Sequence, residues 1–302
     1  MKKTNLEKEN EFKSYHPLIS FIYFCIVIGI SMFSMNPVFL GLSFVSSWVY
    51  SIILKGKKAV KFNICFCIPI IIIMTLINGL STHNGMTILF YLNNNAITLE
   101  AILYGLASSV MLCSVIIWFS CYNVVITSDK IIYLFGRIAP VLALTISMCF
   151  RFIPLLKNRF KEINQGQKCM GRDISSGSII FKIRQFFKQV SILIAWSLEE
   201  AIETSDSMEA RGYGLKGRTS FHLYHFEKRD LLALIYILIV SIMPIISCIT
   251  GKTDIYYYPK IVFTKLEIMT IISMITYLLL LLFPVIIEVK GARKWKKFNL
   301  EM

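Results

Sequence analysis

Two short motifs carry the residues of this sequence that are best suited to binding another molecule. Ala210-Arg211-Gly212 follows a long amphipathic stretch, and Cys169-Met170-Gly171, succeeded by Arg172, follows a shorter one. Each motif is a small residue, a long one and a glycine. Many helices stop in this way, because glycine adopts the left-handed conformation cheaply. The repetition of the ending on two helices of one basic segment favours a second role beside helix termination.

The other chemically capable residues form neither a catalytic site nor a metal site. Seven of the eight cysteines lie in apolar stretches, where cysteine behaves as a small hydrophobic residue. His222 and His225 are three residues apart but lack a third ligand. The run Gly251-Lys252-Thr253 resembles the end of a phosphate-binding loop, but Ile246 stands where its first glycine is required. We therefore predict no catalytic residue, no metal site and no ATP hydrolysis by that kind of loop.

Long apolar stretches dominate the 302 residues, of which 56% are hydrophobic. A helix needs about 20 mostly apolar residues to cross a bilayer core, and its backbone groups must be satisfied internally in lipid. Six stretches meet this requirement, at 18–35, 37–54, 62–79, 100–126, 231–250 and 268–288. The first follows 16 mostly polar residues of mixed charge and carries no small-residue cleavage site, so we expect a retained span. The sequence predicts an all-α integral membrane protein with about six transmembrane helices plus long amphipathic helices in the cytoplasm.

The net charge is +14, and the distribution of its Lys and Arg residues indicates an orientation in the membrane. Lys and Arg collect in the cytoplasmic loops of membrane proteins, and no basic run here carries a nucleic-acid-binding motif. The loop 55–61 contains four lysines and no acid, and the tail after Val289 contains five Lys and Arg. The stretch 80–98 contains no Lys, Arg, Asp or Glu. We therefore expect the lipid bilayer, and no nucleic acid, as a partner, with both termini in the cytoplasm.

The stretch 131–156 is apolar enough to suggest a further span, but its charges argue against one. If it crossed, residues 157–190 would lie outside with eight Lys and Arg against two acids, contrary to the positive-inside rule. Arg151 would also cost about 2.5–3.5 kcal/mol at the bilayer centre. We expect a helix at the cytoplasmic interface instead. The predicted domains are a four-span block over 1–128, a cytoplasmic insertion over 129–229, and a two-span hairpin with a basic tail over 230–302.

One long amphipathic helix is predicted in the insertion, from about Ile179 to Arg211. Its apolar residues recur at three- and four-residue steps, which places them on one stripe. At 1.5 Å per residue the helix is roughly 48 Å long, longer than a bilayer core is thick. A shorter helical stretch, from Pro154 to Gly171, precedes it across a turn rich in serine and glycine.

This segment resembles the transmembrane (T) component of energy-coupling factor transporters, which are importers driven by ABC-type ATPases. The run Met208-Glu209-Ala210-Arg211-Gly212-Tyr213-Gly214 resembles the family's second Ala-Arg-Gly motif. Arg151-Phe152-Ile153-Pro154 matches the element before its first coupling segment, and Thr98-Leu99-Glu100-Ala101 resembles the entry to its fourth span. The resemblance covers about residues 90 to 230. At one position the chain departs from the pattern, because Met170 stands where the first motif has its arginine.

The resemblance implies partners, a site and a location. The residues that it assigns to docking two ABC-type ATPase subunits are Ala210, Arg211, Gly212, Cys169, Met170, Gly171 and Arg172. Those that it assigns to supporting these coupling ends are Arg151, Pro154, Glu209 and Tyr213. A membrane-embedded substrate-binding (S) component would capture a vitamin or a transition-metal ion. The chain would lie in a bacterial cell membrane and hold no cofactor, because ATP and Mg²⁺ are bound by the ATPases. Which substrate is carried, and whether Arg172 replaces the missing arginine, stay open.

Two other functions are compatible with a membrane protein of this composition. A secondary transporter requires ionisable residues at mid-membrane, but the acids nearest the predicted spans lie at span ends, namely Glu100, Asp230, Glu267 and Glu288. A membrane-embedded enzyme requires a nucleophile and a base, or metal ligands, at one depth, and the sequence offers no such set. Either protein would act without ATPase partners, so co-purification of an ATPase pair distinguishes these functions from the one implied by the resemblance.

Overall fold

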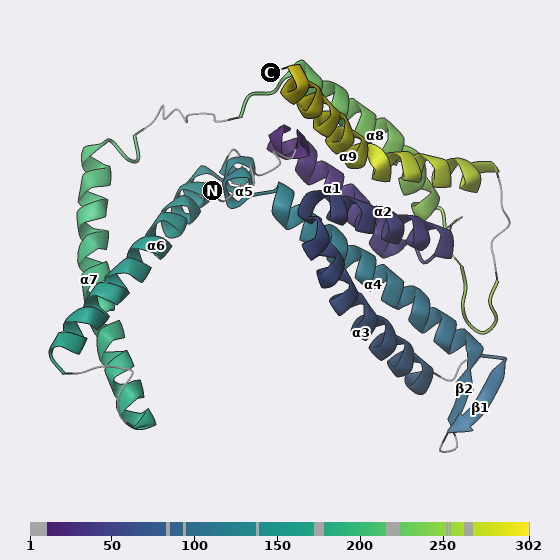
Figure 1. The fold of residues 1–302 in the computed structure, drawn as a ribbon, viewed down its shortest axis with the longest axis horizontal. Helices are drawn as coiled ribbons and strands as arrows, with labels where there is room; N and C mark the ends of the chain where they lie inside the picture. The colour runs from purple at the N-terminus through teal and green to yellow at the C-terminus, as the bar shows by residue number, and fades with distance from the viewer. Residues whose placement is uncertain are drawn as a thin grey trace. The chain divides into compact units, whose positions relative to one another are not determined.

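The computed structural model describes residues 11–82, 85–92, 95–136, 139–171, 178–215, 224–251, 253, 255–262 and 268–301. Within these ranges the regular structure is helical except for one two-stranded hairpin and an isolated β-bridge (Figure 1). The elements are η1 (Glu11–Ser14), α1 (Pro17–Phe33), α2 (Pro37–Lys55), α3 (Lys57–Ser81), β1 (Ile88–Leu92), β2 (Asn95–Thr98), α4 (Leu99–Val125), α5 (Ser128–Gly136), α6 (Pro140–Cys169), α7 (Ile179–Ala210), α8 (Lys228–Ile249) and α9 (Ile268–Glu301). The predicted all-α membrane class is confirmed.

The chain divides into two compact units. The membrane unit comprises residues 1–130 and 224–302 and contains η1, α1 to α4, the hairpin, α8 and α9. The crossed-helix unit comprises residues 131–223 and contains α6 and α7. The division into three domains stays a prediction, and its first and last parts belong to one compact unit here.

Six described helices are long and apolar enough to cross a membrane: α2, α3, α4, α6, α8 and α9. Five of them coincide with predicted spans. The predicted first span is α1, whose 17 apolar residues fall just short of the usual length. The remaining helix is α6, for which the sequence predicts a place at the interface. Its length and composition suit a span while the charges after it do not, so its place outside the bilayer stays a prediction.

The core of the membrane unit lies among α1, α2, α4 and α9, where Tyr23, Tyr50, Trp118 and Tyr277 are fully buried. Two serine hydroxyls connect all four of these helices. Ser31 Oγ lies 2.7 Å from Ser43 Oγ and 2.9 Å from Tyr277 Oη, and Trp118 Nε1 donates to Ser43 Oγ at 3.1 Å. Polar groups in a membrane core need such partners, because lipid offers none.

A β-hairpin and several polar contacts at one end of the membrane unit are not predicted from the sequence. The uncharged stretch after α3 forms the antiparallel hairpin β1–β2, and Thr98 Oγ1 caps α4 by accepting from the Ala101 amide. The buried Glu100 accepts from the Thr87 amide at 3.2 Å. Across the bundle, the Tyr257 hydroxyl donates to the Met35 carbonyl at 3.0 Å. Neither the hairpin nor these contacts follow from a pattern of apolar spans.

Candidate partner-docking site

The first helix of the crossed-helix unit, α6, is continuous from Pro140 to Cys169. The sequence predicts two separate pieces that meet near Pro154, but the helix continues through this proline. An interior proline removes one backbone hydrogen bond and often kinks a helix without ending it. Arg151 and Pro154 are both exposed, one turn apart on α6. The two residues thus lie on the same helix as the Cys169 end, 18 and 15 residues before it.

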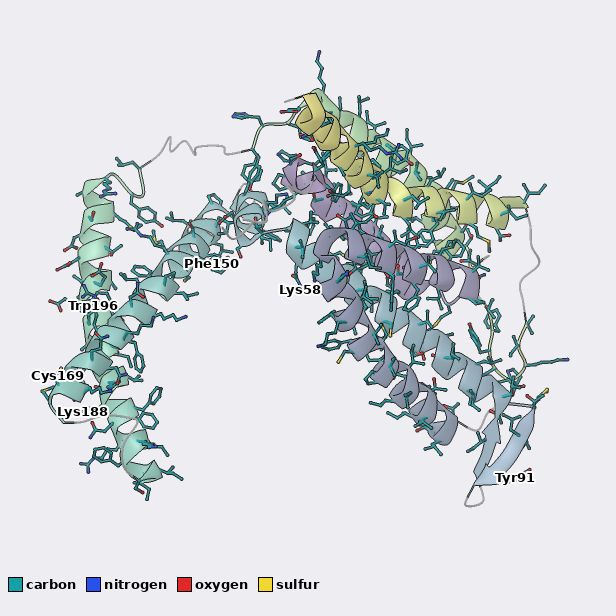
Figure 2. The ribbon with its side chains drawn as sticks, in the orientation of Figure 1. Lys58, Tyr91, Phe150, Cys169, Lys188 and Trp196 are labelled. Carbon is teal, nitrogen blue, oxygen red and sulfur yellow. The ribbon has the colours of Figure 1, made fainter. Side chains whose placement is uncertain are left out.

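The second helix, α7, runs from Ile179 to Ala210, which confirms the predicted long helix to within a residue. It crosses α6 through a set of mixed contacts. The Arg159 guanidinium lies 4.7 Å from the Trp196 ring centroid, and the Phe160 and Phe186 centroids are 6.0 Å apart. The crossing can be followed in Figure 2, where Cys169 marks the end of α6 while Lys188 and Trp196 mark the part of α7 that passes it.

Glutamines, not apolar residues, are the buried side chains at this crossing. Gln167 on α6 and Gln185 and Gln189 on α7 are 7%, 8% and 0% exposed, and Gln189 Nε2 donates to Asn164 Oδ1 at 3.2 Å. The sequence reasoning missed this polar contact. The i, i+4 spacing of Gln185 and Gln189 was the available signal, because it places both on one face of the helix.

The predicted apolar stripe of α7 is therefore left exposed. Its members with more than half of the side chain accessible are Ile179, Ile180, Ile183, Phe187, Ile194, Leu198 and Ile202. A continuous apolar face of this length is typical of a surface that contacts lipid or another protein. Within the crossed-helix unit no described residue covers the stripe, so its covering partner must come from outside that unit.

The two helices end with the same backbone geometry. Met170 has φ −85° and ψ 11°, and Arg211 has φ −85° and ψ 7°. The glycines that follow have φ of +74° at Gly171 and +80° at Gly212, a left-handed conformation that residues with a side chain rarely adopt. In both ends the glycine amide donates to the carbonyl three residues earlier, to Lys168 at 3.0 Å and to Glu209 at 2.9 Å.

The long residue of each ending is available for contact. Met170 is 60% exposed, and Cys169, Ala210, Arg211 and Glu209 are also exposed. Tyr213, whose amide donates to the Met208 carbonyl at 3.0 Å, is 47% exposed. Arg172 lies outside the described residues, so the structure does not place the residue that could replace the missing arginine.

The ends lie at different distances from the crossing. On α6 the buried Gln167 is two residues from the end at Cys169. On α7 the contact of Trp196 with Arg159 lies 14 residues (196 to 210), or roughly 21 Å at 1.5 Å per residue, before the end at Ala210. The second motif thus lies well beyond this contact, whereas the first lies close to the buried Gln167.

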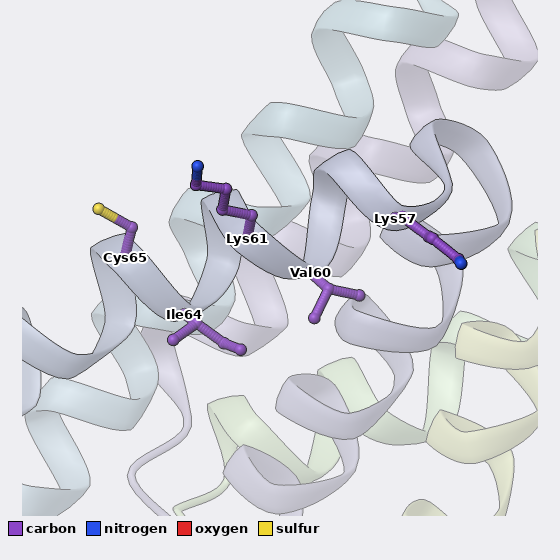
Figure 3. Close-up of a pocket in the computed structure, with 5 residues that line it drawn as sticks. All are labelled: Lys57, Val60, Lys61, Ile64 and Cys65. Carbon is purple, nitrogen blue, oxygen red and sulfur yellow. The ribbon is translucent and has the colours of Figure 1, made fainter.

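Two hollows on the membrane unit are lined by none of the predicted site residues. One follows α3 and is lined by Lys57, Val60, Lys61, Ile64 and Cys65, the two lysine side chains pointing away from each other (Figure 3). The other lies between α1 and α8 and is lined by Cys25, Ile26, Gly29, Ile30, Phe33, Ile245, Cys248 and Ile249. Their mostly apolar linings suit lipid or protein contact. Among the described residues no three His, Cys, Asp or Glu side chains come together as a metal site.

The fold and the paired helix ends define a multi-pass membrane protein that presents two matched helix termini on a separate unit. A family model described as CbiQ, cobalt transport protein, matches residues 6–223. The chain belongs to this family. The resemblance to T components of energy-coupling factor transporters is confirmed by the same comparison and by the names of curated relatives.

Three relatives are each named as an energy-coupling factor transporter transmembrane protein, EcfT. The protein from Staphylococcus aureus is 28% identical over 213 residues, which are 65% of this chain and 80% of the relative. The Lactobacillus helveticus protein is 37% identical over 104 residues, 34% of this chain and 38% of the relative. EcfT 1 of Listeria monocytogenes is 37% identical over 93 residues, 30% and 35% of the two chains. The matches to the last two thus span well under half of those relatives.

Proposed function

We propose that this chain is the transmembrane coupling subunit of an energy-coupling factor importer. It carries motion from two ATP-hydrolysing ABC-type subunits to a membrane-embedded S component, which captures a vitamin or a transition-metal ion. The single observation that carries the proposal is the identical backbone geometry of the two exposed helix ends, at Met170-Gly171 and Arg211-Gly212. Two matched ends suit two copies, or two close relatives, of one partner subunit.

Arg211 is the principal docking residue in this proposal. It is exposed, and within the described part of the chain no acid pairs with it. An unpaired guanidinium at a helix end can form a bidentate pair with a carboxylate of a partner. The left-handed Gly212 then lets the partner surface approach the helix end closely, because it has no side chain.

The first end docks differently, because Met170 offers no charge. Methionine is flexible and polarisable and adapts to an apolar groove, so we assign this end to apolar contact with the second ATPase subunit. In this proposal Arg172, two residues further on, contributes a positive charge to the same contact.

The exposed stripe of α7 is assigned to the S component and to lipid. Its exposed apolar residues extend from Ile179 to Ile202, and burying each of them against a partner would contribute at most about 1.5–3 kcal/mol. A helix held in this way along its length, with an ATPase at its end, moves the S component whenever the ATPase moves. Both termini are placed in the cytoplasm of a bacterial cell, in line with the basic loops. ATP and Mg²⁺ belong to the ATPases and not to this chain.

The test is co-expression of the chain with its ATPase pair and an S component. Arg211→Ala should reduce ATPase affinity about 30-fold or more, the effect of losing a hot-spot arginine worth about 2 kcal/mol, and Arg211→Glu should abolish uptake. Arg184→Glu, an exposed charge reversal on the same helix, is the matched control and should leave both nearly unchanged. Full uptake by Arg211→Glu would overturn the proposal, as would uptake by the chain without ATPases, the behaviour of a secondary transporter.

A further inference from the structure

The first described residues of the chain, 11–16, lie at a junction of the membrane unit. They comprise η1 and the two residues before α1, and we name them the N-terminal hook. The hook contacts α9, the start of α5 and the start of α8. The chain leaves the membrane unit for the crossed-helix unit after Lys130 and returns at Tyr224. Both connections therefore begin or end next to the hook.

The contact with α9 fixes the hook to the membrane core. Glu288, 7% exposed, accepts hydrogen bonds from the amides of Glu11 at 3.3 Å and Phe12 at 3.2 Å. Phe12 is fully buried, and its ring centroid lies 5.6 Å from that of Tyr23 on α1. At Gly291 a Cβ atom would collide with the Glu11 side chain, so the absence of a side chain there permits the close approach.

The outgoing connection is held by Lys130. Its side chain is only 3% exposed, and its Nζ donates to the Lys13 carbonyl at 2.6 Å. Burying an ammonium is costly unless it gains a partner. A buried lysine at this position therefore indicates a specific polar contact and not packing alone. Here the ammonium joins the last residue of the membrane unit to the backbone of the hook.

The returning connection is held by aromatic contacts with the same hook. The His16 ring packs edge-to-face on Phe226 with centroids 5.2 Å apart. The Arg229 guanidinium lies 4.3 Å from the centroid of the Tyr15 ring, a cation–π contact, and also lies 3.9 Å from the buried Asp230. Two connections separated by nearly a hundred residues of sequence are thus fastened to six consecutive residues.

We propose that the N-terminal hook is a positioning device that ties both connections of the crossed-helix unit to α1 and α9. Movement of that unit then displaces the ends of α1 and α9, because both connections are fixed to these helices through the hook. The inference rests on the proposed function, because it concerns how ATP-driven motion is transmitted. It adds residues that are far in sequence from the docking motifs.

The experiment measures substrate imported per ATP hydrolysed by the complete complex in proteoliposomes. Lys130→Met removes the ammonium and should fold, because replacing a buried charge by an apolar residue of similar size is often neutral or stabilising. Tyr15→Leu removes the aromatic face beneath Arg229 but keeps an apolar side chain. Both variants should assemble with the ATPases and hydrolyse ATP, yet import at least about threefold less substrate per ATP. Lys130→Arg, which keeps a charged donor, should recover at least half of the loss.

Lys290→Met is the matched control, because it makes the same change at an exposed position of α9 close to Glu288, and it should import normally. If the variants that assemble keep the wild-type ratio, the hook has no role in coupling and the inference is overturned. A wild-type chain that neither binds ATPases nor supports ATP-driven uptake would overturn the proposed function instead, so the two failures are distinguishable.

Discussion

Met170 and Arg211 have the same backbone conformation, with φ −85° at both and ψ of 11° and 7°, although one side chain is apolar and the other is charged. Each is followed by a left-handed glycine, and each ends a helix of the crossed-helix unit. The two ends that we propose for docking thus share their backbone geometry but not their charge. The proposal therefore has two separate contributions to docking, the shape of the end and the salt-dependent pairing of an arginine.

The first prediction concerns charge at the Met170 end. Met170→Arg should tighten binding of the ATPases about three- to tenfold at low ionic strength, because an arginine there could pair with a carboxylate as Arg211 is proposed to do. The gain should shrink in 0.5 M salt, since exposed ion pairs are screened. Retention of the ATPases on the immobilised chain, measured at two salt concentrations, checks both statements. Weaker binding of Met170→Arg at low salt would show that this end requires an apolar residue.

The second prediction concerns the two glycines. Alanine at either position is strained by the positive φ, at about 1 kcal/mol. At Gly212 a Cβ would also lie 3.1 Å from Leu215 Cδ1, whereas at Gly171 it would meet nothing within 4 Å. Gly212→Ala should therefore loosen its helix end more than Gly171→Ala. Hydrogen exchange of the Tyr213 amide should accelerate at least about fivefold in Gly212→Ala, and an unchanged rate would argue against the left-handed end.

The third prediction concerns pH. Burial, reinforced by the charge of Lys13, lowers the pKa of Lys130 to about 8, against about 10.4 for an unfolded lysine. Between these values the unfolded chain binds more protons than the folded one, so this group makes the free energy of unfolding rise with pH from about 8 to about 10.4. Below pH 8 the destabilisation that comes from burying the charged Lys130 ammonium is fully present.

Lys130→Met lacks this titration. The difference in unfolding free energy between wild type and variant should change by at most about 3 kcal/mol, in favour of the wild type, from pH 7.5 to pH 10.5. Denaturant titrations of the purified chain in detergent at several pH values measure it. Parallel pH profiles for the two proteins would show that Lys130 titrates normally.

The fourth prediction concerns the polar contacts in the membrane core. Ser43→Ala should destabilise the chain by about 1–2 kcal/mol, because it leaves the Trp118 N–H without its acceptor and removes a partner of Ser31. Ser114→Ala is the control, since that equally buried hydroxyl bonds only to the Met111 carbonyl of its own helix. Its loss should cost under about 0.5 kcal/mol in the same unfolding measurement, and equal effects of the two variants would contradict the assigned network.

Several features of the fold could be predicted because they depend on local periodicity. The spans follow from continuous apolar runs, and α7 follows from apolar residues at helical spacing. The stop at Gly212 follows from the conformational freedom of glycine. The hairpin β1–β2 could not be predicted in this way. Its strands are short, and the segment leading into it is held by contacts that only the folded chain makes: the Thr87 amide donates to Glu100 and the Met86 amide donates to the Pro259 carbonyl.

The Ala-Arg-Gly ending, its degenerate partner at Met170 and the length of α7 were determined by the sequence alone, because helix propensity and glycine stops act over a few residues. Tertiary structure alone decided two further points. The crossing of α6 and α7 buries Gln185 and Gln189 and leaves the apolar stripe exposed, and Lys130 meets the Lys13 carbonyl. Each depends on contacts between residues far apart in sequence, or on which face of a helix finds a neighbour. Periodicity identifies the faces of a helix, but only packing decides which of them is covered.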